Sequence, residues 1–198
     1  LVNEFSSACN EIGIEPMEVI DTAATNPSGF TRFRPGPGVG GHSLPNDPHY
    51  LTWQMRRYRM RMPVVESAMN AIAERPMQVV ARIQALLSDA GVAARGAHVL
   101  VVGVAYKPNI GDVRESPAIE IVGRLIDLGI AVTIADQRVR AMPLPDGRVV
   151  EVERLEDVAV ADFDLVLVHT LHDNEDLTPL ADAQLLLDAT YQLDPQPQ

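Results

Sequence analysis

The sequence predicts an α/β fold in which a helical first part is followed by a parallel β-sheet. Up to about residue 90, apolar residues recur at the three- and four-residue spacing of amphipathic helices. From Ala97 to Val104 the pattern becomes a continuous apolar run, AHVLVVGV, which is typical of a strand buried on both faces. Strands and helices then alternate along the chain, which indicates a parallel sheet with helices on both faces.

The first part contains four predicted helices and one long loop. These helices are expected over residues 1–12, 17–24, 47–60 and 63–90. Asp47 and Pro48 suit the N-cap and first turn of the third helix. Pro76 predicts a kink or a restart in the fourth helix. The stretch 26–48 is rich in proline and glycine and is predicted to be a loop.

The second part contains four predicted strands, which cover residues 97–104, 131–135, 163–168 and 185–187. An amphipathic helix is expected over 116–128, with Ser116 as its N-cap and Pro117 at its first position. Short helices are expected near Leu155 and Leu177. We place a domain boundary within 91–96, which gives one domain of residues 1–92 and another of residues 93–198.

The composition limits the partners that the chain can bind. The chain carries 27 acidic and 16 basic residues, a formal net charge of −11. A chain this acidic repels phosphate backbones and anionic membrane surfaces, so we expect no nucleic-acid or membrane partner. Cys9 is the only cysteine, which excludes an internal disulfide and suits a reducing cytoplasm. The chain starts at Leu1 within a helical pattern, so we expect it to begin inside a longer protein.

The stretch PGPGVGGHSLPND, from Pro35 to Asp47, is the first candidate site. Four glycines between residues 36 and 41 allow backbone N–H groups to approach a ligand closely. The polar end of the stretch precedes a predicted helix N-terminus, where the helix dipole favours negative charge. The residues alone leave two alternatives open: a loop that holds a small anionic or polar ligand, and a simple crossover between helices.

The second candidate site follows the first strand, because open parallel sheets bind ligands at the carboxyl ends of their strands. Lys107 is suited to an anion and Tyr106 to stacking on a base, although a lysine at such a position is often only solvated. Arg114 adds a second cation, or pairs with a neighbouring carboxylate. His169 and His172 have no third ligand in view, so we predict no metal site.

Two runs together identify a resemblance. PGPGVGGHSLPNDPHYL, and GVAYKPNIGDVRESPAIEI about sixty residues later, resemble the UDP-glucose/GDP-mannose dehydrogenase family over essentially the whole chain. The branch that oxidises UDP-N-acetylmannosamine and related UDP-sugars is the most similar. The resemblance implies a central helical segment that forms a homodimer, followed by a C-terminal Rossmann-like domain that binds UDP-sugar. Members oxidise the sugar C6 alcohol to a carboxylate in two NAD-dependent steps, and the main NAD domain would precede Leu1.

The resemblance also implies roles for particular residues. Ser43 stands at the position of the catalytic cysteine and Asp47 at that of the catalytic aspartate. Gly38, Gly40 and Gly41 would bind the sugar, and Tyr106 and Lys107 would bind the UDP moiety. Arg114 would contact NAD. Arg34, or alternatively Arg32, would contact the ligand of a neighbouring subunit.

Ser43 is the main departure from the family. The family's cysteine forms a thiohemiacetal and then a thioester, whereas a serine hydroxyl is far less acidic than a thiol of pKa about 8.5. Three hypotheses remain open. The chain is a substrate-binding and dimerising portion of a dehydrogenase, inactive alone; or a degenerate binding or assembly protein; or part of an enzyme that stops at the aldehyde. The serine is either natural or engineered.

Overall fold

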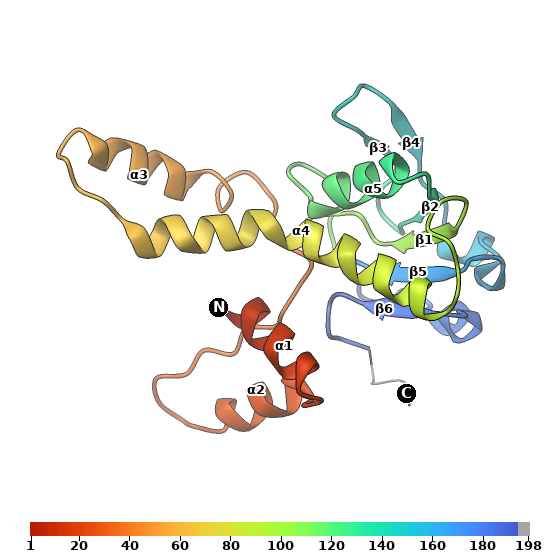
Figure 1. Ribbon diagram of the computed structural model, residues 1–198, viewed down its shortest axis with the longest axis horizontal. Helices are drawn as coiled ribbons and strands as arrows, with labels where there is room; N and C mark the ends of the chain where they lie inside the picture. Colours follow the sequence, from red (N-terminus) through yellow and green to blue (C-terminus); the bar gives the residue numbers. More distant parts are fainter. Residues whose placement is uncertain (194–198) are drawn as a thin grey trace.

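The computed structural model describes residues 1–193, and its first part consists of helices (Figure 1). They are α1 (Val2–Glu11), α2 (Pro16–Ala24), α3 (Asp47–Arg56) and α4 (Pro63–Asp89). Helices α3 and α4 form a hairpin that projects away from the sheet, and the second half of α4 returns to it (Figure 1). None of the helices in residues 1–193 has the length and hydrophobicity that a membrane crossing requires.

The second part is built on a four-stranded parallel sheet, which confirms the predicted fold class. Its strands are β1 (His98–Val102), β2 (Ala131–Ala135), β5 (Leu165–Val168) and β6 (Leu186–Asp188), in the order β2-β1-β5-β6. The strand β1 pairs with β2 and β5 on its two sides, with Val101 opposite Ile134 and Leu167. Helix α5 (Pro117–Asp127) connects β1 to β2 and is capped by the Ser116 hydroxyl, which accepts from the Ala118 N–H.

The two faces of the sheet are covered differently. Val99 and Val101 of β1 pack in the core under α4 and α5, whereas Leu100 and Val102 face the opposite layer. That layer is made of the 3₁₀-helices η1 (Leu155–Asp157), η2 (Val160–Asp162) and η3 (Thr178–Asp182). The short helices expected near Leu155 and Leu177 are therefore present as 3₁₀ turns, and α-helices cover only one face.

Two further elements differ from the sequence expectation. An antiparallel hairpin of β3 (Ala141–Pro143) and β4 (Val149–Glu151) was not predicted, because three-residue strands carry too little alternation to be recognised. Helix α4 does not restart at Pro76, which lies inside one continuous helix. The ring of Pro76 is buried, so tertiary packing outweighs the local cost of the missing hydrogen bond.

Gly103 follows β1 directly, and its replacement tests how tightly the strand ends are packed. Its φ is +74°, and a Cβ there would overlap the carbonyl oxygen of Thr170, which follows β5. We expect Gly103→Ala to lower the unfolding free energy by roughly 3 kcal/mol or more, measured by urea denaturation.

Gly123→Ala is the matched control for Gly103→Ala. Gly123 lies inside α5 and a Cβ there would meet nothing within 4 Å. Alanine should stabilise the helix there by about 0.5–1 kcal/mol. Equal effects of the two substitutions would contradict the close approach of the β1 and β5 termini.

Candidate functional site

A pocket of about 170 Å³ lies at the carboxyl edge of the sheet, where β1, β5 and β6 end. The stretch from Pro35 to Asp47, called the glycine-rich loop below, contributes one wall, and the turn after β1 contributes another. The pocket therefore brings together four residues that the sequence singled out, which are Arg34, Gly38, Tyr106 and Lys107. The remaining wall comes from the segments after β5 and β6, including His169, Thr170 and Thr190.

The glycines of the loop are needed because Tyr106 lies directly against them. A Cβ on Gly40 would be 2.7 Å from the Tyr106 Cβ and 2.5 Å from the Glu115 carbonyl oxygen, and one on Gly41 would be 2.9 Å from the Tyr106 ring. The Gly41 N–H donates to the Arg114 carbonyl oxygen at 3.0 Å. The glycine-rich loop and the turn after β1 thus pack as one unit that a larger residue would separate.

The beginning of this loop is held by the peptide of Gly36. Its N–H donates to Asn3 Oδ1 of α1 at 2.8 Å, and its carbonyl oxygen accepts from Arg75 Nε of α4 at 2.9 Å. Arg75 is 7% exposed and also donates to Gln78 and to Ser7 of α1. Arg34 donates to the Tyr191 carbonyl oxygen at 2.8 Å. These bonds attach the helical part to the pocket. No local pattern in the sequence marks Arg75 for this role.

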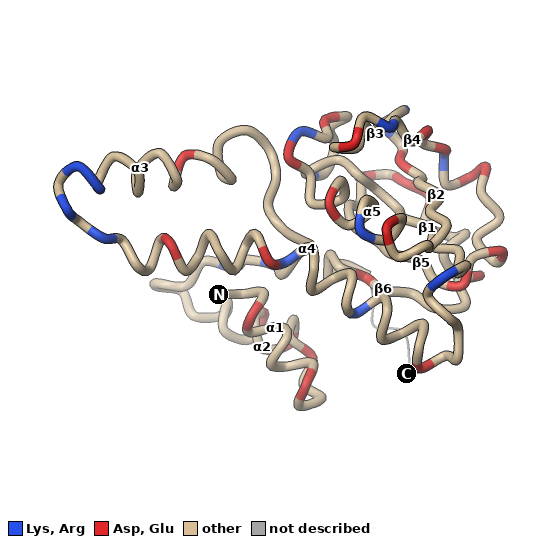
Figure 2. Tube along the Cα trace, turned by 45° about the horizontal axis from the view of Figure 1, so that its top comes forward, with Lys and Arg blue, Asp and Glu red and all other residues tan. Residues whose placement is uncertain are grey.

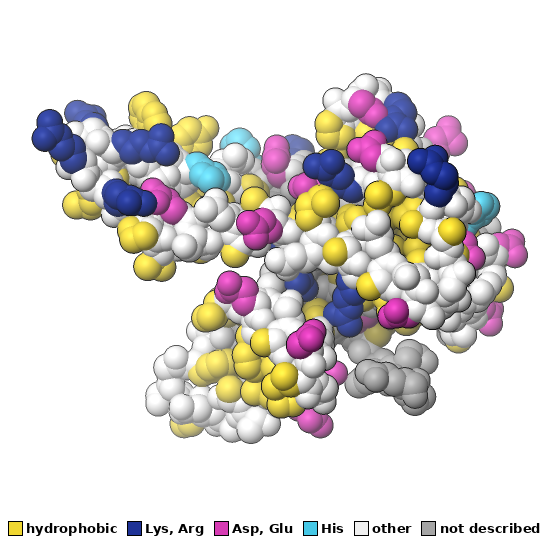
Figure 3. All heavy atoms as spheres, in the orientation of Figure 1, with side chains coloured by type: hydrophobic (Ala, Val, Ile, Leu, Met, Phe, Trp, Pro, Cys, Tyr) yellow, Lys and Arg dark blue, Asp and Glu magenta, His cyan; other side chains and the backbone are white. Residues whose placement is uncertain are grey.

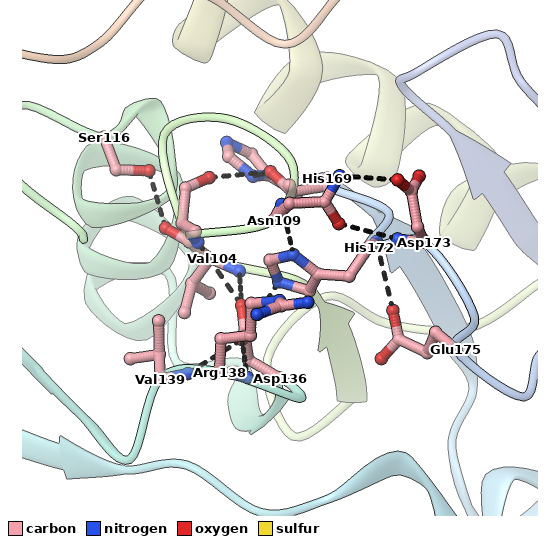
Figure 4. Close-up of polar contacts among 12 residues, drawn as sticks. Val104, Asn109, Ser116, Asp136, Arg138, Val139, His169, His172, Asp173 and Glu175 are labelled. Atoms are coloured by element: carbon pink, nitrogen blue, oxygen red, sulfur yellow. Dashed lines mark hydrogen bonds and ion pairs between the residues drawn. The ribbon is translucent and has the colours of Figure 1, made fainter. Parts of the chain in front are cut away.

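The turn after β1 is organised by the buried carboxylate of Asp136, which follows β2 (Figure 4). Its Oδ2 accepts from the N–H groups of Val104 at 2.7 Å and Ala105 at 3.3 Å. Its Oδ1 accepts from the N–H groups of Arg138 and Val139 and from His172 Nε2 at 3.1 Å. One carboxylate therefore joins the ends of β1 and β2 to the segment after β5.

The ionisation of Asp136 follows from these donors. Burial raises the pKa of Asp136, but the hydrogen bonds from His172 and from the backbone N–H groups outweigh it and lower the pKa to about 2. The charged carboxylate then contributes about 2 kcal/mol of stability, which is present above the ordinary pKa of 3.8 and lost as the pH falls toward 2.

His172 occupies a defined tautomer in this network. Its Nδ1 accepts from the Asn109 N–H at 2.9 Å, so the proton must be on Nε2, which donates to Asp136. The side chain of Asn109 in turn exchanges two hydrogen bonds with Asp173 (Figure 4). His172 therefore fixes the loop that follows Lys107 and has no nitrogen left for a metal ion.

His169 is buried with one nitrogen unused. The Thr170 hydroxyl donates to the Ala105 carbonyl oxygen at 2.7 Å, so His169 Nδ1–H donates to that hydroxyl at 2.9 Å. Nε2 is then an acceptor, and it is the buried side-chain atom of residues 1–193 that has no partner. Burial lowers the pKa of His169 to about 4, so the ring is neutral at pH 7.

The Asp136 network limits which backbone N–H groups at the strand ends are available to a nucleotide. In a dinucleotide-binding fold, the turn after the first strand and the following helix N-terminus offer N–H groups to a pyrophosphate. Here the N–H groups of Val104 and Ala105 are occupied by Asp136, and α5 begins only at Pro117 with its own serine cap. The described residues therefore do not fit NAD at this position.

Lys107 supplies the free positive charge of the pocket. It is the only lysine of the chain, it is exposed, and its ammonium lies 5.7 Å from the centre of the Tyr106 ring. No carboxylate within residues 1–193 forms an ion pair with it. An anionic group entering the pocket would meet this unpaired charge beside an aromatic ring.

Five other predicted site residues do not line the pocket: Gly40 and Gly41, which pack against Tyr106, and Ser43, Asp47 and Arg114. Ser43 and Asp47 are exposed at the start of α3, where the Asp47 N–H donates to the Ser43 carbonyl oxygen at 2.8 Å. The N-cap of α3 is Asn46 rather than Asp47. The guanidinium of Arg114 is exposed and pairs with Asp112 at 2.6 Å, which is the alternative that the sequence left open. In residues 1–193, no three His, Cys, Asp or Glu side chains gather as a metal site would require.

Comparison with protein families gives two matches that together cover most of the chain. Residues 1–74 match the central domain of the UDP-glucose/GDP-mannose dehydrogenase family, and residues 100–195 match the UDP binding domain of that family.

Similar individual proteins carry related names. The chain is 32% identical over 174 residues to a UDP-N-acetyl-D-mannosamine dehydrogenase of Methanocaldococcus jannaschii, covering 87% of the chain and 36% of that protein. It is 34% identical over 123 residues to the Escherichia coli K12 protein of the same name, covering 60% of the chain and 28% of that protein. The chain thus spans about a third of the length of these relatives.

Solved structures with a similar fold are also named as dehydrogenases of UDP-sugars. A UDP-N-acetyl-mannosamine dehydrogenase of Staphylococcus aureus has a TM-score of 0.72 at 27% identity, with 95% of this chain and 42% of that chain covered. The corresponding Pyrococcus horikoshii structure has a TM-score of 0.82 and covers 99% of this chain and 45% of that chain; at 24% identity it supports the fold alone.

The two buried histidines should respond differently to substitution. We expect His172→Leu to lower the unfolding free energy by roughly 2–4 kcal/mol at pH 7.5, because the buried Asp136 loses a donor and the Asn109 N–H loses its acceptor. His169→Leu should change it by less than about 1 kcal/mol, because it also removes an unpaired polar atom. Chemical denaturation measures both, and a larger loss for His169→Leu would contradict the assignment.

The low pKa of His169 predicts an acid-sensitive fold. In the unfolded chain His169 binds a proton as the pH falls below its ordinary pKa of 6.5. In the folded chain it does so only near pH 4. Folding stability should therefore fall by about 3 kcal/mol between pH 7 and pH 4 through this group. The difference in stability between wild type and His169→Leu, followed by denaturation across this range, isolates the effect. A pH-independent difference would refute it.

Proposed function

Since the chain belongs to the UDP-glucose/GDP-mannose dehydrogenase family, we propose that it binds a UDP-sugar in the pocket at the carboxyl edge of its sheet. The observation that carries the proposal is the unpaired Lys107 beside Tyr106, held against the glycine-rich loop. The match of residues 100–195 to a UDP binding domain supports the same ligand.

The pocket suggests a role for each wall. The Lys107 ammonium pairs with a phosphate oxygen of the diphosphate, and the Tyr106 ring offers an aromatic surface beside it. Arg34 is a second cation at the pocket rim, and Gly38, Gly40 and Gly41 bring backbone close to the sugar side. The neutral ring of His169 adds no charge to this wall.

We further propose that the chain acts as the C-terminal portion of an NAD-dependent nucleotide-sugar 6-dehydrogenase of the cytoplasm. It would supply residues 1–92 as a dimerisation and substrate-loop domain and residues 93–198 as the UDP domain. NAD would accept hydride in such an enzyme; the turn after β1 does not fit it, and the exposed Arg114 is the residue of this chain that we propose contacts it. We therefore propose that this chain binds the substrate and that a separate nicotinamide-binding domain carries out hydride transfer.

Ser43 favours a second candidate function, a degenerate protein that binds UDP-sugar or serves assembly without full oxidation. The Ser43 side chain is exposed, and the N–H groups of Asn46 and Asp47 donate to the Ser43 carbonyl oxygen, so these bonds leave the hydroxyl without a base to activate it. An oxyester is also a poorer intermediate than a thioester. An enzyme that carries this serine would accordingly stop at the aldehyde.

The helical part is proposed to form a homodimer. Among the described residues, all large apolar side chains that are exposed lie between residues 1 and 77, with Val149 as the exception. They include Trp53 at 68%, Tyr50 at 69% and Val64 at 82% exposure. Apolar surface concentrated on one segment is typical of a protein–protein interface.

Isothermal titration calorimetry with UDP tests the binding site. The wild-type chain should bind UDP, and Lys107→Met should weaken binding at least tenfold because it removes the free charge of the pocket. Arg140→Met is the matched control, since Arg140 is exposed but does not line the pocket. Absence of UDP binding by the folded wild-type chain would contradict the proposal and favour a structural role.

An assay of NAD reduction tests the assignment of partial function. The purified 198-residue chain should produce no NADH from UDP-N-acetylmannosamine or UDP-glucose, because its residues do not hold NAD. Ser43→Cys should remain inactive for the same reason, which separates a missing cofactor site from a missing nucleophile. Turnover by either protein would overturn this assignment.

A further inference from the structure

Helices α1 and α2 present an acidic surface with apolar residues at its centre. Glu11, Glu15 and Glu18 are exposed, and so are Ile12 and Ile14, which lie between Glu11 and Glu15 in the chain, and Val19, which follows Glu18. No lysine or arginine occurs before Arg32. We call these six residues the acidic patch, and Figure 3 shows magenta side chains beside yellow ones on this part of the molecule.

The tip of the α3–α4 hairpin has the opposite charge. Arg56, Arg57, Arg59 and Arg61 occur within six residues, with the exposed Tyr58 and Met60 between them. We call this segment, 56–61, the arginine tip (Figures 2 and 3). In residues 1–193 its one ion pair joins Arg61 to Glu66 at 3.9 Å, so most of its charge is uncompensated in a chain of net charge −11.

The arginine tip and the acidic patch cannot meet within one molecule. Helix α4 runs without a break from Pro63, two residues after the arginine tip, to Arg75, where the Arg75 guanidinium contacts Ser7 of α1. Twelve residues of α-helix hold these two points about 18 Å apart. Figures 1 and 2 both show the tip and the α1–α2 pair at separate ends of the helical part.

The arginines nearest to the acidic patch are engaged elsewhere. Arg32 pairs with Asp21, and Arg34 donates to the Tyr191 carbonyl oxygen. Within the described residues neither these arginines nor Arg82 forms an ion pair with Glu11, Glu15 or Glu18. Glu15 and Glu18 line a pocket together with Arg32, Arg34 and Arg82, but no glutamate of the acidic patch forms an ion pair in residues 1–193, so each can still pair with a cation of another molecule.

We propose that the arginine tip of one copy docks on the acidic patch of a second copy, and that the reverse contact forms at the same time. The inference rests on the homodimer proposed above and specifies its orientation. A two-fold dimer makes each such contact twice, so the two surfaces need only be complementary to one another. This contact would place arginine and tyrosine side chains against glutamate and isoleucine side chains. It would combine charge pairing with the burial of apolar surface, as protein interfaces do.

Charge exchange between the surfaces tests the proposal by sedimentation velocity on the full 198-residue chain. The wild type should dimerise with a dissociation constant that rises with salt. Arg57→Glu/Arg59→Glu and Glu15→Lys/Glu18→Lys should each weaken the homodimer at least tenfold. An equimolar mixture of the two should regain wild-type affinity, because in that heterodimer one contact is native and the other is charge-reversed on both sides.

Arg140→Glu/Arg148→Glu makes the same charge change on the β3–β4 side of the molecule and should leave the dissociation constant unchanged. Circular dichroism checks that each variant is folded. A wild-type dimer that is insensitive to the tip and patch variants, or a mixture that does not regain affinity, would overturn the proposed docking while the homodimer stands. A wild type that stays monomeric at 100 μM, roughly the concentration at which such interfaces form, would overturn both.

Discussion

The buried carboxylate of Asp136 is the interaction on which the arrangement of the site depends. Five donors converge on it from the turn after β1, from the turn after β2 and from His172 after β5. A charge without solvent is stable only when it is paired in this way, and the donors lower its pKa to about 2 despite burial. The carboxylate thereby takes the N–H groups that a dinucleotide pyrophosphate would use. The sheet keeps the topology of a nucleotide-binding fold, and the binding place that we propose lies further out, at Tyr106 and Lys107.

The glycine-rich loop extends this constraint to the helical part. Because Gly40 and Gly41 lie against Tyr106, the position of the loop follows from the position of the turn after β1. The Gly36 peptide then connects the loop to α1 and α4 through Asn3 and Arg75. The projecting α3–α4 hairpin is left with exposed aromatic and arginine side chains, which a second copy of the chain would cover.

Much of this architecture could be predicted from the sequence. The apolar run around β1 and the Ser116-Pro117 start of α5 are strong local signals, and the structure confirms both. The site was predictable in part, since Lys107 and the loop glycines are marked by residue type and by position in the chain. Asp136, His172 and Arg75 were not, because each acts through partners more than thirty residues away. The short helices near Leu155 and Leu177 were expected, although not as 3₁₀ turns, whereas the three-residue strands of the β3–β4 hairpin are too short to show a period.

We propose that a UDP ligand binds above the strand ends and leaves the Asp136 network intact. The most direct test is a titration of the isotopically labelled chain with UDP, followed by the backbone amide resonances in NMR. We expect the largest shifts at Tyr106 and Lys107 and in the loop 36–41, with the amides of Val104 and Ala105 keeping their hydrogen-bonded positions. Large shifts at Val104 and Ala105, with none in the loop, would mean that the ligand displaces the carboxylate and would contradict the account.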